Sequence, residues 1–207
     1  MRMDYHLHSA FSGDGRSTIG EICAEAQRKG LTNIAITDHH DIGNTNYELR
    51  DPEAYLADLE RCRARCSGMD VAFGVEMDYR ADTWDAMRRL PERWGLDFAL
   101  LSLHFVDGTD PYLPEYFEGR TQREGYSHYL RRLAEMIAVT EGPWVLGHIT
   151  YVSKFARFPD ATLRYADYAD ELDEVLRLAV QKGYGLEANA SGIKNGTGPL
   201  PGADILQ

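Results

Sequence analysis

The sequence predicts an α/β protein built around a parallel sheet. Short apolar runs alternate with amphipathic helical patterns along its 207 residues, which is typical of parallel strands joined by helical crossovers. Residues that bind metals also recur where successive apolar runs end. An open doubly wound sheet and a closed barrel both fit this pattern. No glycine-rich phosphate loop follows the first strand, which disfavours a dinucleotide- or nucleoside-triphosphate-binding protein.

Six strands and four helices are expected from these patterns. The strands are expected at residues 3–7, 33–37, 70–75, 98–103, 144–147 and 184–188. Thr18 and Glu21 form a capping box at the start of the first helix, and Gly30 ends it. Asp51 and Pro52 suit the start of a second helix over residues 51–66. Two later apolar stripes predict the other helices: Tyr126, Leu130, Leu133 and Ile137, then Tyr168, Leu172, Val175 and Ala179.

The cysteines favour a packing role. Cys23, Cys62 and Cys66 are an odd number, which does not indicate a disulfide framework. Cys62 and Cys66, four residues apart on the second helix, could hold a metal ion. They continue an apolar stripe with Tyr55 and Leu59, however, so we interpret them as core thiols.

Charge and hydropathy narrow the classes of function. The chain has 33 acidic and 22 basic residues and a net charge of −11, which disfavours nonspecific binding of nucleic acid. It contains no apolar run of about 18 residues, and its start is too polar for a signal peptide. We therefore expect a cytoplasmic protein with no membrane partner, organised as a single domain over residues 1–207.

Five predicted strands each deliver a histidine or a glutamate at their carboxyl ends, where parallel sheets place their chemistry. A lone histidine of this kind is more often a buried, hydrogen-bonded residue, and a lone glutamate can be an ion-pair partner. The joint pattern indicates a metal site instead. The residues concerned are His6, His8, His39, Glu76, His104 and His148, whereas His40 lies beside His39 and His128 falls in mid-helix.

The ligand types indicate which ions the site would hold. Mixed imidazole and carboxylate ligands suit zinc, iron or manganese better than magnesium. Five histidines and a carboxylate exceed what one tetrahedral ion needs, so we expect two or three divalent ions. A pair of ions about 3.5–4 Å apart can activate water and stabilise the leaving oxygen of a phosphate ester.

Four motifs together resemble the PHP (polymerase and histidinol phosphatase) superfamily. They are residues 4–9 (DYHLHS), 12–15 (SGDG), 36–39 (ITDH) and 102–104 (SLH). Residues 147–148 (GH) and 186–192 (LEANASG) are similar to the histidinol-phosphate phosphatases within it. The resemblance spans nearly the whole chain and implies a distorted (β/α)7 barrel.

The resemblance also implies a trinuclear site. His6 and His8 would hold one ion, Glu76 would bridge to a second held by His104 and His148, and Asp14 and His39 would hold a third. Glu76, His104 and His148 would lie at the reacting centre. In the family, two further ligands follow a seventh strand. Neither that strand nor those ligands are found in this sequence, so the domain is expected to be incomplete at its C-terminus. Residues 199–207 resemble the start of the helix before that strand, and Asp204 is expected to lie in it.

The activity implied by the resemblance is hydrolysis of a phosphate monoester by a metal-activated hydroxide, with histidinol phosphate of histidine biosynthesis as the substrate. Phosphate-binding cations are expected among Arg16, Lys154, Arg157 and Lys194, and the glycine-rich residues 192–198 could add backbone amides. The acidic, aromatic segment 105–121 would suit a cationic imidazole and amine. Two alternatives remain: a PHP phosphoesterase acting on nucleotides or nucleic acid, and a metal-binding domain that is inactive because C-terminal ligands are absent.

Overall fold

The computed structural model describes residues 2–44, 47–49, 51–196 and 198–207. The chain divides into two compact units, Met1–Leu100 and Leu101–Gln207. The division falls within strand β4 (Phe98–Ser102), so each unit contains part of that strand.

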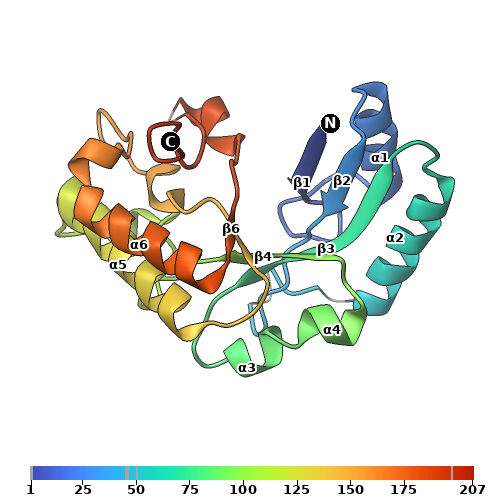
Figure 1. The fold of residues 1–207 in the computed structure, drawn as a ribbon, viewed down its shortest axis with the longest axis horizontal. Coiled ribbons are helices and arrows are strands. Elements are labelled where there is room, and N and C mark those ends of the chain that lie inside the picture. The colour runs from blue at the N-terminus through green and yellow to red at the C-terminus, as the bar shows by residue number, and fades with distance from the viewer. Residues whose placement is uncertain (1, 45–46, 50, 197) are drawn as a thin grey trace. The chain divides into compact units, whose positions relative to one another are not determined.

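The first unit is a parallel sheet with helices that follow its strands (Figure 1). Strand β1 pairs with β2 and β2 with β3, both in parallel, and β4 comes next in the order. Helices α1 and α2 contact each other, and α2 also packs on β3. The elements are β1 (Met3–Leu7), α1 (Ile19–Arg28), β2 (Asn33–Ile36), α2 (Pro52–Arg65), β3 (Asp70–Asp78), α3 (Trp84–Met87) and α4 (Leu90–Trp94).

Side-chain caps begin the two long helices of this unit, as the sequence predicts. The Thr18 hydroxyl accepts a hydrogen bond from the Glu21 backbone N–H, and the Glu21 carboxylate accepts one from the Thr18 N–H. Asp51 accepts a hydrogen bond from the Ala54 N–H and so caps α2, where Pro52 is the first residue. Each cap satisfies backbone donors that a helix leaves unpaired at its start.

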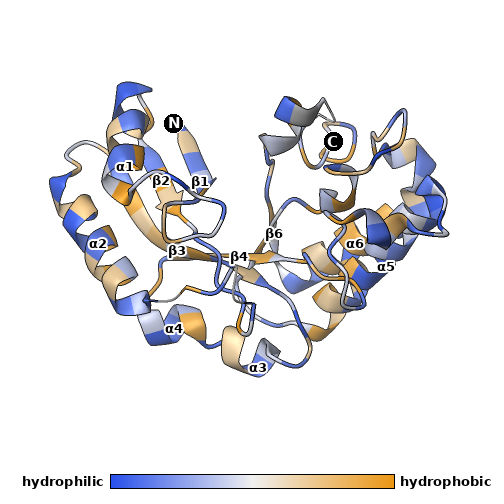
Figure 2. Ribbon diagram, turned by 180° about the vertical axis from the view of Figure 1, so that it is seen from behind, coloured by the Kyte–Doolittle hydropathy of each residue, from blue (hydrophilic) through white to orange (hydrophobic). Residues whose placement is uncertain are grey.

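The core of the first unit lies between its helices and sheet. Ile34 and Ile36 of β2 are fully buried with Tyr55 and Leu59 of α2. Both α1 and α2 carry hydrophilic and hydrophobic residues, as Figure 2 shows, and the larger hydrophobic ones pack inward. This burial against one face of the sheet is what an amphipathic crossover helix requires.

The second unit is built from the end of β4, two short strands and two long helices. Strands β5 and β6 pair in parallel, and α5 and α6 lie side by side (Figures 1 and 2). Both predicted apolar stripes are buried at this helix pair. The elements are η1 (Pro114–Phe117), α5 (Gln122–Val139), β5 (Val145–Leu146), η2 (Tyr151–Ser153), η3 (Tyr165–Asp167), α6 (Ala169–Lys182), β6 (Gly185–Leu186) and η4 (Ser191–Asn195).

The predicted order of strands and helices is confirmed, but several boundaries differ. Strand β3 continues past Val75 to Asp78, because the His40 N–H donates to the Glu76 carbonyl and the Glu76 N–H to the Asp38 carbonyl. These bonds prolong the pairing beyond the end of β2. Strands β5 and β6 have only two residues each, shorter than expected. The short helices α3 and α4 were not predicted, since neither is long enough to show a periodic stripe.

The helix expected near the end of the chain is wrong. Residues 203–205 form a turn, and Asp204 accepts a hydrogen bond at 2.8 Å from the backbone N–H of Tyr165. The nearby Pro201 lacks a backbone donor, and Gly202 has a low helix propensity. Asp204 therefore supports the segment before α6 rather than lying in a helix.

Candidate metal centre

Five of the predicted metal ligands come together within the first unit. His6 lies in β1, and His8 follows just after its end, so the two side chains point to the same face. Asp14 lies in the loop before α1, His39 follows β2, and Glu76 lies within β3. The carboxyl ends of three adjacent parallel strands thus deliver all five side chains to one place.

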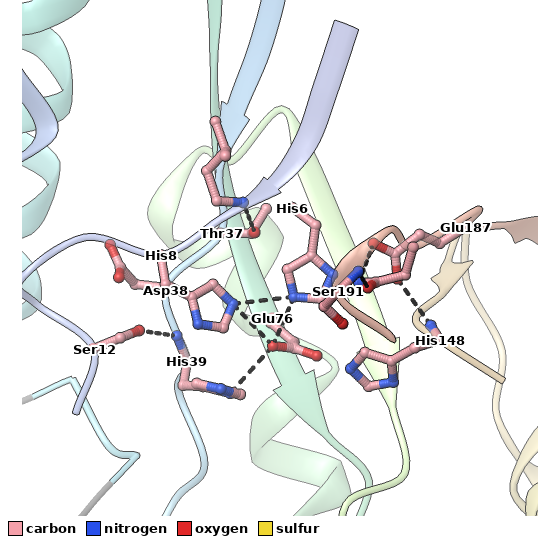
Figure 3. A network of polar contacts seen from close by, with 12 residues as sticks. His6, His8, Ser12, Thr37, Asp38, His39, Glu76, His148, Glu187 and Ser191 are labelled. Carbon is pink, nitrogen blue, oxygen red and sulfur yellow. Dashed lines mark hydrogen bonds and ion pairs between the residues drawn. The ribbon is translucent and has the colours of Figure 1, made fainter. Parts of the chain in front are cut away.

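The tightest group is formed by His6, His8 and Glu76. The two Nε2 atoms are 3.0 Å apart, and they lie 3.0 Å and 3.1 Å from Glu76 Oε2 (Figure 3). Ligands about 2.0–2.1 Å from one zinc ion lie about 3.0–3.4 Å from each other, depending on the coordination geometry. The three atoms therefore have the chemistry and the spacing of ligands around a single ion.

A second group shares His8 and adds Asp14 and His39. His8 Nδ1 lies 3.0 Å and 3.1 Å from the two carboxylate oxygens of Asp14, and His39 Nε2 lies 3.8 Å from Asp14 Oδ2. The other nitrogen of His39 is 3.3 Å from Glu76 Oε2, which links the two groups. These donors also fit a divalent ion.

The electrostatics of the first unit favour a bound cation. Burial alone would lower the pKa of His8, but hydrogen bonds to Asp14 and Glu76 outweigh it and raise the pKa to about 9. Burial would raise the pKa of Asp14, but hydrogen bonds with His39 and His8 lower it well below its ordinary value. The carboxylates of Asp14 and Glu76 thus stabilise positive charge at the place where a metal ion would bind.

The second unit brings its two predicted ligands together. His104 follows β4 and His148 follows β5, both are buried, and their Nε2 atoms lie 3.4 Å apart. Glu187, just after β6, accepts a hydrogen bond at 2.8 Å from the His148 backbone N–H (Figure 3). Its other oxygen accepts one at 2.9 Å from Asn189. Glu187 therefore fixes the backbone that carries His148.

Sequence reasoning missed Tyr151 and Glu187. The Tyr151 ring lies 5.1 Å from the ring of His104 and 5.0 Å from that of His148, and its hydroxyl is 3.0 Å from Asp110 Oδ1. Tyr151 thus joins the two histidines to the long segment after β4. The position of Tyr151 three residues after His148 offered no periodic signal. Glu187 lies within the quoted LEANASG motif, where its acidic side chain after a strand was the available sign.

The predicted phosphate-binding cations occupy different settings. Arg16 is exposed two residues after Asp14. Lys154 is half-buried, with its Nζ 5.1 Å from the ring centre of Phe155, whereas Arg157 and Lys194 are exposed. In the glycine-rich stretch 192–198, residue 197 lies outside the described residues. Phosphate binding by these cations stays a prediction.

The remaining histidines and the cysteines have other surroundings. Burial lowers the pKa of His40, whose Nδ1 accepts a hydrogen bond from the Leu49 N–H. His128 is partly exposed and pairs with Asp107 at 2.8 Å. Cys23 and Cys62 are buried in the core of the first unit, and Cys66 packs against it. All three thiols are free, as expected of core cysteines.

Among the described residues, no helix combines the length and the apolar character needed to cross a bilayer.

Comparison with known proteins identifies one family. The profile of the PHP domain matches residues 4–191. The chain is 27% identical over 194 residues to the probable histidinol-phosphatase of Clostridium acetobutylicum, an alignment that covers 91% of this chain and 73% of that protein. It is 28% identical over 197 residues to the histidinol-phosphatase of Lactococcus lactis, which covers 91% and 71%.

Solved structures show the same fold. The crystal structure of histidinol phosphate phosphatase from Lactococcus lactis, complexed with zinc, L-histidinol and phosphate, matches with a TM-score of 0.86 and 25% identity, covering 91% of this chain and 73% of that one. The crystal structure of the putative histidinol phosphatase HisK from Listeria monocytogenes has a TM-score of 0.86 at 20% identity, covering 99% of this chain and 89% of that one. These matches confirm the expected PHP fold.

Proposed function

Because the chain belongs to the PHP domain family, we propose that it is a metal-dependent phosphatase whose substrate is histidinol phosphate. The observation that carries this is the convergence of the His6, His8 and His39 nitrogens on one buried oxygen of Glu76. The relatives named above support the choice of substrate, since the two matched over most of this chain are called histidinol-phosphatase.

The proposed metal ligands follow from the imidazole and carboxylate groups of the site. We propose that two or three divalent ions, zinc, iron or manganese, bind to His6, His8, Asp14, His39, Glu76, His104 and His148. Zinc has the strongest support, because it is present in the related structure from Lactococcus lactis. When bound, such ions activate water and neutralise the charge of a phosphoryl group.

The side chains of the chain itself would prepare the site in three ways. The buried Glu76 holds imidazole nitrogens at ligand spacing, so little rearrangement is needed when an ion binds. Asp14 keeps His8 in place through Nδ1, which leaves Nε2 directed at Glu76. We propose that Arg16, Lys154, Arg157 and Lys194 bind the phosphate oxygens. The guanidinium group of Arg matches phosphate with two parallel donors, and Lys supplies a compact positive charge.

The substrate proposal extends to the segment 105–121. Asp110 in this segment lies beside the Tyr151 hydroxyl, and the ring of Tyr112 contacts that of Phe155 at 4.7 Å. Acidic and aromatic groups together favour a cationic ligand, such as the imidazole and amine of histidinol phosphate. A neutral sugar carries no positive charge for these groups to attract.

The test is a comparison of phosphate release from histidinol phosphate, a neutral sugar phosphate and a nucleoside monophosphate. The proposal predicts a clear preference in kcat/KM for histidinol phosphate, and a smaller preference after Asp110→Asn. The matched control is Asp82→Asn, an exposed carboxylate in the other unit. Equal rates on all three substrates would contradict the proposed substrate, whereas metal binding without turnover of any of them would contradict the proposed activity.

A further inference from the structure

Asp38 is a buried acid that has no part in the ligand set. Its carboxylate is fully buried and accepts two hydrogen bonds from Ser9, one from the backbone N–H and one from the hydroxyl, both at 2.6 Å. Short bonds to a charged acceptor are among the strongest in proteins. A carboxylate this deeply buried is tolerated because each of its oxygens accepts a hydrogen bond.

These two bonds join two segments that carry proposed ligands. Ser9 directly follows His8, and Asp38 directly precedes His39. The Asp38–Ser9 pair therefore spans 29 positions of the chain to tie the neighbour of one ligand to the neighbour of another.

A second connection runs between the same segments. The His39 backbone N–H donates to the Ser12 hydroxyl at 2.8 Å (Figure 3), and the Ser12 N–H donates to the Ser9 carbonyl at 3.0 Å. The Ser9 hydroxyl also accepts a bond from the Phe11 N–H at 3.2 Å. The loop after His8 is thus folded around Ser9 and bonded to the strand end at both Asp38 and His39.

The separation of these segments sets the geometry of the second ligand group. Asp14 lies in the loop that Ser9 and Ser12 hold, and His39 lies on the strand end that Asp38 holds. Metal–ligand distances fall within about 0.2 Å of their ideal values, so a displacement of the loop by more than that should weaken metal binding. The groups that hold ligands in place are accordingly an important part of such sites.

We infer that Asp38 is a positioning residue, which acts through Ser9 to hold the loop with His8 and Asp14 at metal-binding distance from His39. This role rests on the proposed metal dependence of the site. Asp38 is not itself one of the proposed metal ligands.

The test measures zinc affinity in the full chain by competition with a coloured chelator, for wild type, Asp38→Asn, Ser9→Ala and Ser12→Ala. We expect Asp38→Asn to weaken zinc binding by about 10–100-fold and Ser9→Ala by a smaller factor. The double variant of Asp38 and Ser9 should bind about as weakly as Asp38→Asn alone, because the hydroxyl bond that Ser9→Ala removes is one of the two bonds that Asp38→Asn already disturbs. Ser12→Ala should add its own loss to that of Asp38→Asn.

The matched control is Tyr184→Phe. It removes a buried hydroxyl of the second unit that donates to the Thr140 hydroxyl at 3.1 Å. If Asp38 and Ser9 served stability alone, their variants would behave like this control, with a lower Tm and an unchanged zinc affinity. We expect Tyr184→Phe to lower the Tm of the metal-free protein and leave zinc affinity unchanged, whereas Ser9→Ala should lower zinc affinity.

Zinc affinity within twofold of wild type in both folded Asp38→Asn and folded Ser9→Ala would overturn this role. Circular dichroism checks the fold, and Ser9→Ala alone decides the matter if Asp38→Asn does not fold. The readout is independent of turnover, so a failure to hydrolyse histidinol phosphate would refute the proposed substrate without changing the result for Asp38.

Discussion

Replacing Glu76 by Gln tests whether this side chain holds a metal ion. The buried carboxylate places Oε2 3.0 Å from His6 Nε2, 3.1 Å from His8 Nε2 and 3.3 Å from His39 Nδ1. Gln preserves the volume but removes the negative charge that the ion needs. The affinity for zinc should fall by at least about 100-fold, which is the upper end of the loss seen when a supporting group is removed.

The size of the effect on stability follows from mass action. Zinc at 100 times its Kd stabilises the native protein by about 2.7 kcal/mol. In a chain of about this size, 1 kcal/mol shifts Tm by about 2–4 °C, so zinc should raise the Tm of the wild type by about 5–11 °C. At the same concentration, a variant that binds 100-fold more weakly gains about 0.4 kcal/mol and less than about 2 °C.

The assay is thermal unfolding followed by circular dichroism, with zinc and with excess chelator. Glu60→Gln, an exposed change on α2, serves as the control and should keep the full zinc-dependent shift. If Glu76→Gln is folded and shows the same rise in Tm as the wild type, Glu76 is not a ligand and the proposed site is wrong.

Three further outcomes are expected. Burial and the neighbouring thiols raise the pKa of Cys23 to about 12. Alkylation of Cys23 at pH 8 should therefore be far slower in the native protein than in urea, and it should accelerate as the pH rises toward 12. In Gly147→Ala the new Cβ would lie 2.3 Å from Ser102 Oγ, so urea unfolding should show a loss of about 1–3 kcal/mol that Ser102→Ala partly restores. Thr121→Ala breaks the capping box with Glu124 and should cost about 1 kcal/mol in the same measurement. Equal alkylation rates in the native protein and in urea would contradict the burial of Cys23. Unchanged stability in either variant, or no recovery in the double variant of Gly147 and Ser102, would contradict the contact or the cap concerned.

Local patterns predicted much of the fold. The bounds of β1 were predicted correctly, and the caps of α1 and α2 were identified, because each depends on residues close together in sequence. The convergence of His6, His8, His39 and Glu76 followed from a topological rule, since parallel strands present their carboxyl ends along one edge.

What the sequence could not predict depends on long-range contacts. The bonds of Asp38 to Ser9 and of Glu187 to His148 join residues 29 and 39 positions apart, and no periodicity reports such pairs. The extension of β3 through Glu76 likewise depends on how the chain continues after β2. These contacts hold the ligand-bearing segments in place, and because they join residues far apart in sequence, only the folded structure reveals them.

The central claim, metal-dependent hydrolysis of histidinol phosphate, is tested most directly by phosphate release from this substrate after chelation and stepwise return of zinc. The proposed function predicts that the chelated protein is inactive, that activity returns in proportion to bound zinc, and that Glu76→Gln does not recover at the same zinc concentration. Undiminished activity in the metal-free protein, or zinc-loaded wild type that releases no phosphate from histidinol phosphate, would contradict it.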